Sequence, residues 1–274
     1  MVGHVSVPTA ALLDELPSWA TLVRAPNPGP MTLDGTNTWV LRAEPDAPAI
    51  VVDPGPLDEG HLAAVAAYRP IGLILSTHGH FDHIEGIGRL VELVPDAVVV
   101  NSRGPLVSSA GLELEGLETP GHTADSVCFL VSSKGSRPEG IGRAGQRERA
   151  VLTGDTILGR GTTVVAWPDG NLGDYVDSLE VLAGLGSIPV LPGHGPPLAD
   201  CAVAARFYLT HRRARLDQVR AAREAGARTP ADVVERVYSD VDRSLWPAAE
   251  WSVRAQLAYL DGESGDPELG LDPP

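Results

Sequence analysis

Three imidazoles and one carboxylate lie within six consecutive positions of this sequence. They belong to the segment Thr77-His78-Gly79-His80-Phe81-Asp82-His83, which directly follows an apolar run. Imidazole nitrogen is a preferred ligand of Zn²⁺-like cations, and a carboxylate adds negative charge. Alternate residues of an extended segment project to the same side, so His78 and His80 can share one cation. Asp82 and His83 lie at the start of a predicted helix, where they point elsewhere and can serve a second cation.

Three further candidate ligands each follow a strand-like run and lie beside a glycine. They are His122 in TPGHT, Asp155 in LTGDT and His194 in LPGHG. Strand ends hold side chains rigidly, and neighbouring glycines let the backbone approach a crowded centre. Together with the first segment they provide five histidines and two aspartates, which suits two cations that share a bridging carboxylate and a bridging solvent. We therefore expect a dinuclear metal site, with Zn²⁺ as the first choice and Fe or Mn as alternatives.

A purely structural role is the alternative for each of these residues. Taken singly, His4, His61 and His211 are best explained as surface or hydrogen-bonded core residues. The cluster differs, because burying that many polar groups without a metal would leave them without partners. Asp155 by itself is a weaker candidate, since an aspartate before threonine at a strand end can simply cap a turn.

The elements that must position these residues are short strands and helices. Apolar runs rich in β-branched residues and bounded by turn signals predict strands. These runs lie at 20–25, 36–43, 49–55, 71–77, 97–101, 126–131, 150–155 and 188–195. Apolar positions at helical spacing predict helices at 60–68, 83–94 and 174–185. This order favours helices packed outside sheets.

From about residue 200 the sequence predicts helices alone. A long helix is expected over 202–226, and Thr229 with Pro230 fits the cap and first residue of the next helix. We therefore divide the chain into a catalytic domain at 1–198 and a small helical domain at 199–274.

The composition is that of a folded chain, and it limits the partners. Of the 274 residues, 43% are hydrophobic and 21% are charged, which excludes a disordered or collagen-like chain. Asp and Glu exceed Lys and Arg by 15, so the average field repels polyanions and argues against DNA. Cys128 and Cys201 form no disulfide framework, and Cys128 is expected in the core. Because no export signal or membrane span is predicted, we expect a cytoplasmic protein without a membrane partner.

The Thr-His-x-His-x-Asp-His-x-x-Gly stretch, with three ligands downstream, resembles the metallo-β-lactamase superfamily. The resemblance implies an α+β fold, a four-layer αβ/βα sandwich with its metal sites at one edge. It also implies a first metal held by His78, His80 and His122, a second held by Asp82, His83 and His194, and Asp155 as the bridge. Such a site activates a metal-bridging hydroxide for hydrolysis, and Asp82 is the candidate catalytic residue that orients it and accepts its proton.

Longer stretches are similar to the β-lactamase-like ribonuclease branch, which carries a small C-terminal domain resembling a winged helix. They lie at 27–41, 119–126, 154–164, 191–198 and 208–215. The main departure is 132–149, a Gly-, Ser- and Arg-rich loop segment, where relatives tend to have a shorter hairpin. This resemblance implies a metal-dependent hydrolase that acts on short single-stranded RNA.

Other reactions stay open. The ligand arrangement is also similar to that of glyoxalase II, so a hydrolase of small-molecule esters or thioesters is the main alternative. An iron-dependent persulfide dioxygenase shares the histidine pattern but resembles a one-iron site. A flavodiiron protein is disfavoured because those proteins usually have Glu where His80 stands, and a β-lactamase because the secreted ones use Cys where Asp155 stands. A non-catalytic binding module would not need all seven ligands.

One predicted helix departs from the acidic average. Residues 203–228 contain seven Arg and two acidic residues, and they follow closely after His194. We predict that His211, Arg212 and Arg215 meet a phosphate or carboxylate of the substrate, since an arginine fork suits both. The alternative is a solvated helix face paired with Glu and Asp.

Overall fold

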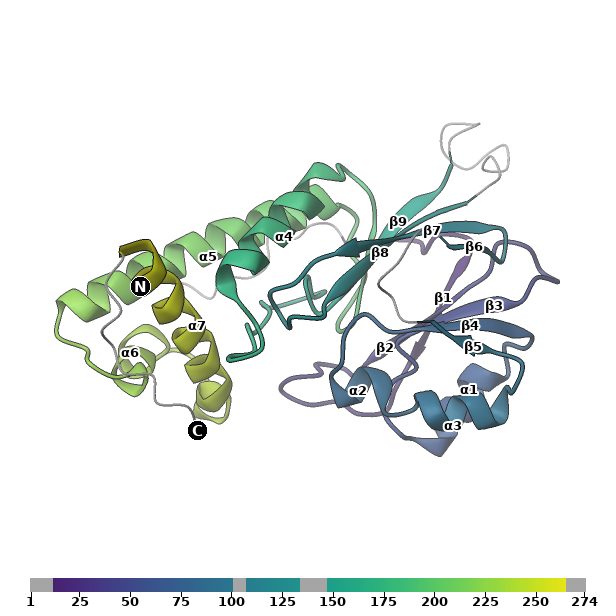
Figure 1. Cartoon of the computed structure of the whole chain (residues 1–274), viewed down its shortest axis with the longest axis horizontal. Helices are drawn as coiled ribbons and strands as arrows, with labels where there is room; N and C mark the ends of the chain where they lie inside the picture. Colours follow the sequence, from purple (N-terminus) through teal and green to yellow (C-terminus); the bar gives the residue numbers. More distant parts are fainter. Residues whose placement is uncertain (1–11, 101–106, 134–146, 265–274) are drawn as a thin grey trace.

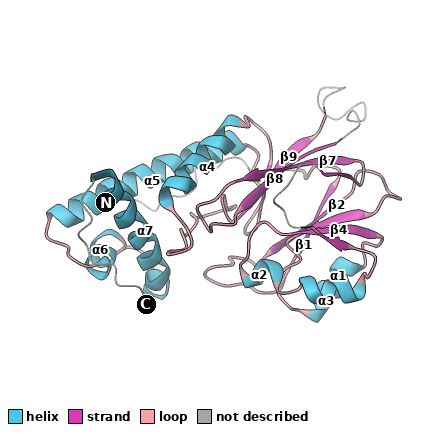
Figure 2. Ribbon diagram, in the orientation of Figure 1, coloured by secondary structure: helices cyan, strands magenta, loops and turns pink. Residues whose placement is uncertain are grey.

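A computed structural model gives the fold, and it describes residues 12–100, 107–133 and 147–264. Two five-stranded sheets lie face to face, with helices on both outer faces (Figures 1 and 2). The predicted α+β sandwich is therefore confirmed. Across these described ranges, none of the helices combines the length and apolar character needed to cross a membrane.

The first sheet is formed by the N-terminal third of the chain. Its strands are Ala20–Arg24 (β1), Asn37–Leu41 (β2), Ala49–Val52 (β3), Ile71–Leu75 (β4) and Val98–Val99 (β5). They lie in that order, antiparallel from β1 to β3 and parallel from β3 to β5. The outer face is covered by Glu59–Ala66 (α1), Phe81–Ile84 (α2) and Ile87–Leu93 (α3).

The second sheet contains the strands Val107–Ser109 (β6), Leu112–Glu118 (β7), Val127–Ser133 (β8), Arg149–Gly154 (β9) and Val190–Pro192 (β10). Their spatial order is β10-β9-β8-β7-β6, and only β10 and β9 pair in parallel. Trp39 and Ile50 of the first sheet pack against Phe129 and Leu152 of the second. Alternate residues of β3 serve both faces, since Val51 packs on the outer helices, which explains why β3 is a continuous apolar run.

The remaining helices form an elongated lobe beside the sandwich (Figure 1). They are Leu172–Gly184 (α4), Cys201–Glu224 (α5), Pro230–Val237 (α6), the 3₁₀ turn Arg243–Leu245 and Trp246–Ser264 (α7). One hydrophobic core joins Val151 of β9 to Tyr175 of α4, Tyr208 of α5 and Val253 of α7. This core crosses the boundary expected at residue 198, so the division into two domains stays a prediction.

Two local predictions differ from the structure. The helix expected at 83–94 is broken in two at Glu85 and Gly86, because Gly86 N donates to Gly55 O and a Cβ on Gly86 would lie 2.7 Å from Leu62 Cδ2. The strands β6 and β7 were not predicted. In β7 leucine alternates with glutamate, a half-buried pattern with no apolar run.

Two other local predictions concern helix α6 and the loop before β9. Thr229 caps α6 as expected, since its hydroxyl accepts from Asp232 N and the Asp232 side chain accepts from Thr229 N. In the predicted loop 132–149, the first two residues extend β8 and Arg149 begins β9. Residues 134–146 of that loop lie outside the described ranges.

Candidate metal centre

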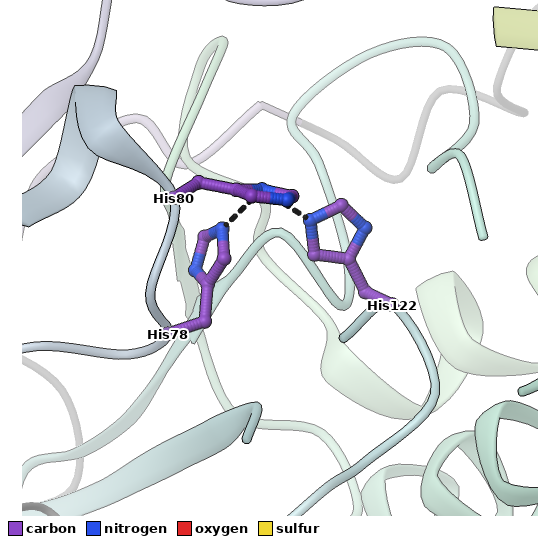
Figure 3. Close-up of side chains that lie close together, drawn as sticks. All are labelled: His78, His80 and His122. Carbon is purple, nitrogen blue, oxygen red and sulfur yellow. Dashed lines mark hydrogen bonds between the residues drawn. The ribbon is translucent and has the colours of Figure 1, made fainter. Parts of the chain in front are cut away.

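His78, His80 and His122 bring three ring nitrogens together, as Figure 3 shows. His78 and His80 lie in the turn between β4 and α2, and His122 lies in the loop after β7. His80 Nδ1 is 2.9 Å from His78 Nε2 and 3.1 Å from His122 Nε2. Burial lowers the pKa of both His78 and His122, so these two rings are neutral at pH 7. Neutral imidazole is the form that binds a cation. We call these three residues set one.

Asp82, His83 and His194 form a second group, which we call set two. Asp82 and His83 belong to α2, and His194 follows β10. His194 Nε2 is 3.1 Å from Asp82 Oδ2 and 3.3 Å from His83 Nε2. Burial lowers the pKa of His194, but the Asp155 carboxylate and hydrogen bonds to Asp155 and Asp82 outweigh burial and raise it to about 11. The local field therefore favours a positive charge at this point.

Asp155 lies between the two sets. Its Oδ2 is 3.4 Å from His194 Nε2 and 3.8 Å from His122 Nε2, and its Oδ1 is 3.6 Å from His83 Nε2. Burial raises the pKa of Asp155, but His194 and His83 outweigh burial and hold it well below the usual value. Among the described residues, the buried Oδ1 has no hydrogen-bond partner. An ionised carboxylate with an unpartnered oxygen between two donor sets fits a ligand that bridges two cations.

Outer partners fix the orientation of two rings. His122 Nδ1 donates to Val164 O over 2.6 Å, which leaves the Nε2 lone pair for a cation. His83 Nδ1 lies 2.9 Å from Asp53 Oδ2, and Asp53 also accepts from Thr77 N and Oγ1. Asp53 was missed in the sequence. Its signal was an acid at the end of a buried apolar run, the same signal that identified Asp155.

Two glycines beside the ligands have no room for a side chain. A Cβ on Gly193 would lie 2.6 Å from Asp155 Oδ1 and 2.8 Å from His83 Cε1. Gly154 has φ +47°, and its Cβ would lie 2.4 Å from Thr77 Oγ1. The expected role of glycine in letting the backbone approach the centre is confirmed at these positions.

The predicted substrate contacts all lie on α5. Arg212 is 3% exposed, donates to Thr163 O, and has its guanidinium carbon 4.9 Å from the centre of the Tyr175 ring. Among the described residues, Arg212 Nε has no hydrogen-bond partner. These contacts direct the Arg212 side chain into the protein interior, against the loop whose Val164 O accepts from His122.

The other two predicted contacts are also engaged within the helical lobe. Arg215 donates to Val237 O over 2.7 Å, which ties α5 to the end of α6. His211 is half-buried and stacks on Phe207, with the ring centres 6.4 Å apart. The structure does not group His211, Arg212 and Arg215 around the donor sets, and their contact with a substrate stays a prediction.

The two cysteines are buried free thiols. Burial raises the pKa of both Cys128 and Cys201, so neither is a thiolate nucleophile at pH 7. The core position predicted for Cys128 is confirmed. The cytoplasmic location stays a prediction.

The chain matches two family models. Residues 31–105 match the metallo-β-lactamase superfamily. Residues 229–263 match the β-lactamase-associated winged helix domain, which lies in the α6–α7 part of the helical lobe.

Similar proteins extend over most of the chain. A β-lactamase-like protein 2 homolog from Caenorhabditis elegans is 30% identical over 284 residues, which cover 94% of this chain and 90% of that protein. An atrochrysone carboxyl ACP thioesterase from Aspergillus fumigatus is 30% identical over 264 residues, covering 85% of this chain and 78% of the relative. A metallo-β-lactamase family protein from Thermus thermophilus has the same fold, with a TM-score of 0.66 at 21% identity, covering 89% of this chain and 94% of that one.

These matches agree with the two facing sheets, the outer helices and the His/Asp donors. The fold implies divalent metal binding, and the thioesterase name of a relative with similar length supports a hydrolase. The chain belongs to the metallo-β-lactamase superfamily and is a hydrolase-type enzyme that carries a β-lactamase-associated winged helix domain.

Proposed function

We propose that this enzyme hydrolyses an acyl thioester with the help of two divalent cations. The observation that carries the proposal is the pair of three-donor sets that both approach Asp155. The proposed ligands are His78, His80 and His122 for one cation and Asp82, His83 and His194 for the other, with Asp155 shared. A one-iron dioxygenase would use a single set, whereas here each set has its donor atoms within 4.8 Å of one another.

Zinc is the cation we propose first, because neutral imidazole and carboxylate oxygen are among its usual ligands. Iron and manganese accept the same donors, so metal analysis of the purified enzyme decides between them. The two sets would hold the cations, which when bound would supply positive charge to polarise the scissile carbonyl and to lower the pKa of the attacking water.

Asp82 is the candidate catalytic residue. Its side chain is 27% exposed, against 12% for Asp155, so Asp82 is the more accessible carboxylate. Asp82 Oδ2 accepts from Thr36 Oγ1 over 3.1 Å and lies 3.1 Å from His194 Nε2. With Oδ2 held in this way, Asp82 Oδ1 is available to orient the attacking water and to accept its proton.

The charge distribution favours a thioester over RNA. A polyanion needs several free cations along one surface, but the positive charge of α5 is largely engaged within the lobe. Its ion pairs are Arg213 with Glu180, Arg220 with Asp217 and Arg223 with Asp261. The net charge of −15 adds a repulsive average field.

A cavity in the helical lobe also favours an uncharged substrate group. It has a volume of about 340 Å³ and lies between the loop before α4 and helix α7, where Trp167, Leu172 and Tyr259 line it. Among the described residues, no charged side chain lines it. Gly170 and Asn171 also line it. Asn171 N donates to the carbonyl oxygen of Gly121, which is the residue before His122. We propose that the acyl part of the thioester occupies this cavity.

The test is a parallel assay of the metal-loaded enzyme on an acyl thioester, a single-stranded RNA oligomer and a β-lactam. We expect the thioester to be hydrolysed, the activity to disappear after treatment with a chelator, and Zn²⁺ to restore it. Cleavage of RNA alone would overturn this ranking and put the ribonuclease interpretation first.

The cavity has its own test. Ala258 of α7 lines it and belongs to neither donor set, so Ala258→Trp is designed to fill the space while every proposed ligand is kept. We expect KM for a long-chain thioester to rise about tenfold, the effect of roughly 1.4 kcal/mol, with little change for an acetyl thioester. Equal effects on both substrates would remove the cavity from the proposal.

A further inference from the structure

His194 is the donor of set two whose position depends most on distant contacts. The other two members, Asp82 and His83, share one turn of α2. His194 comes from the segment after β10, a strand of only three residues. The position of His194 in set two therefore depends on the contacts that hold residues 192–195, which include Gly193 N to Gly154 O and Gly159 N to His194 O.

Asn37 at the start of β2 makes further contacts with this segment. Its side chain is fully buried, and Nδ2 donates to Pro192 O over 3.0 Å and to Gly195 O over 2.8 Å. Its backbone N donates to Gly193 O over 2.8 Å. One residue thus bonds the chain on both sides of His194. Both protons of the amide are used, and Oδ1 accepts from Arg24 Nε over 3.3 Å.

The preceding residue reaches the other segment of set two. Thr36 Oγ1 donates to Asp82 Oδ2 over 3.1 Å, and Asn27 Nδ2 holds the same hydroxyl from the opposite side. Thr36 also forms an isolated bridge with His194. Thr36 and Asn37, the first residue of β2, therefore contact the two separate segments that supply set two.

Set one is supported by other parts of the chain. His122 Nδ1 donates to Val164 O, and His78 Nδ1 lies 3.0 Å from Thr77 Oγ1. Among the described residues, the hydrogen bonds of Asn37 go to Arg24 and to the loop 192–195 and to no member of set one. A change at Asn37 should then disturb the two sets unequally.

We propose that Asn37 is a positioning residue for the second cation: its amide locks the loop 192–195 so that His194 Nε2 meets Asp82 and His83. This inference rests on the proposed two-cation site. Outer residues that orient metal ligands typically change metal affinity by about 10–100-fold when they are replaced. An amide suits this position because its two donor hydrogens reach two backbone carbonyls at once; Pro192 O also accepts from Trp39 Nε1 over 3.1 Å, whereas Gly195 O accepts from the Asn37 side chain.

The experiment measures cation binding rather than turnover. Zn²⁺ affinities of the metal-free enzyme are determined by competition with a chromophoric chelator, and Co²⁺ spectra follow the filling of each set. Asn37→Asp has the same shape but turns a second oxygen toward Pro192 O and Gly195 O. We expect the weaker Zn²⁺ equivalent to lose about 10–100-fold in affinity, while the tighter one changes less than about twofold.

Two milder variants protect the test against misfolding. Asn37→Ser keeps one donor and should give an intermediate loss of affinity. Thr36→Val removes the hydroxyl that donates to Asp82 and accepts from Asn27, and it should weaken the same Zn²⁺ equivalent. Thr229→Ala is the control, because it removes the cap of α6 and lowers stability far from both sets. It should leave both affinities unchanged.

Three results would contradict the positioning role of Asn37 or the two-cation site. If all Asn37 and Thr36 variants keep both Zn²⁺ affinities, the positioning role is overturned. Equal weakening of both equivalents would also overturn it, because that reports general loosening. If the unaltered enzyme binds only one Zn²⁺, the proposed two-cation site itself fails, which is a separate outcome from failure of the Asn37 inference.

Discussion

The donor sets around Asp155 and the arginine-rich helix α5 are both dense in ionisable side chains, but they direct those side chains in opposite ways. In the donor sets, ring nitrogens lie about 3 Å apart, at 2.9 and 3.1 Å in set one (Figure 3) and at 3.3 Å between His83 and His194 in set two. On α5, Arg215 and Arg223 are directed at a carbonyl or a carboxylate of neighbouring helices. The donor sets direct their nitrogen and oxygen atoms toward a shared point, whereas these arginines of α5 pair with groups of the neighbouring helices.

This difference separates a site from a structural cluster. Residue type and spacing distinguished both regions in the sequence, because one is rich in histidine and aspartate and the other is rich in arginine within an acidic chain. What distinguishes them is the partner: Asp155 Oδ1 is buried without one in the described structure, whereas Arg215 has Val237 O at 2.7 Å. Variants in the first region should therefore change metal binding and turnover, and variants in the second should change stability.

The largest effect is expected at Asp155. Asp155→Asn keeps the shape but removes the negative charge that both sets share. We expect kcat/KM for the thioester to fall by about 10³-fold and the number of Zn²⁺ bound per chain to drop, with the fold retained in circular dichroism spectra. Normal Zn²⁺ stoichiometry in this variant would contradict a bridging role.

On the other side of the comparison, Arg215→Met should act through stability. It removes a charged hydrogen bond to Val237 O that ties α5 to α6. We expect the free energy of unfolding in urea to decrease by about 1–2 kcal/mol, with KM unchanged. An increase in KM at unaltered stability would instead favour the substrate contact predicted for this residue.

The fold was readable where the signal is local. Apolar runs bounded by turn residues located β3, β4, β8 and β9 to within a few residues, because buried strands carry that pattern themselves. The break between α2 and α3 was not readable, since it depends on Gly86 packing against Gly55 and Leu62. These contacts form only after the first sheet and α1 have come together.

The same limit applies to the site. Each candidate ligand could be identified in the sequence because its own residue type and position, a histidine or an aspartate near a strand end, indicate it. Asn37 carries none, since it acts on a loop 155 residues further along the chain. Asp53 does carry the signal of an acid at the end of a buried strand, but its role as a partner of His83 depends on a contact with a residue 30 positions away. The sequence therefore indicates the proposed cation ligands more readily than the residues that hold those ligands in place.

A smaller effect is expected from His211, through pH. Burial and the charges of Arg212 and Arg215 lower its pKa from 6.5 to about 4. Between pH 6.5 and 4, His211 is therefore protonated in the unfolded chain but neutral in the folded protein. The free energy of unfolding keeps its full value above pH 6.5 and decreases as the pH falls toward 4. His211→Phe keeps the stack on Phe207 and should reduce this acid loss by on the order of 1 kcal/mol, allowing for solvent screening. Urea unfolding of the metal-free proteins at pH 7.5 and 5 measures it, and identical losses in both would place His211 in a more open setting.

The smallest effect belongs to Arg213, which is the control for the whole helix. Its side chain is 70% exposed, and its Nη2 lies 3.9 Å from Glu180 Oε1, a distance and exposure at which an ion pair contributes less than about 0.5 kcal/mol. Arg213→Ala should leave unfolding, Zn²⁺ affinity and KM for an uncharged thioester unchanged. It removes the same formal charge as Arg215→Met, so a difference between the two variants isolates the contact with Val237 from the charge itself. If Arg213→Ala alone raised KM for an anionic substrate, the solvent face of α5, rather than its buried face, would be the part of the helix that meets the substrate.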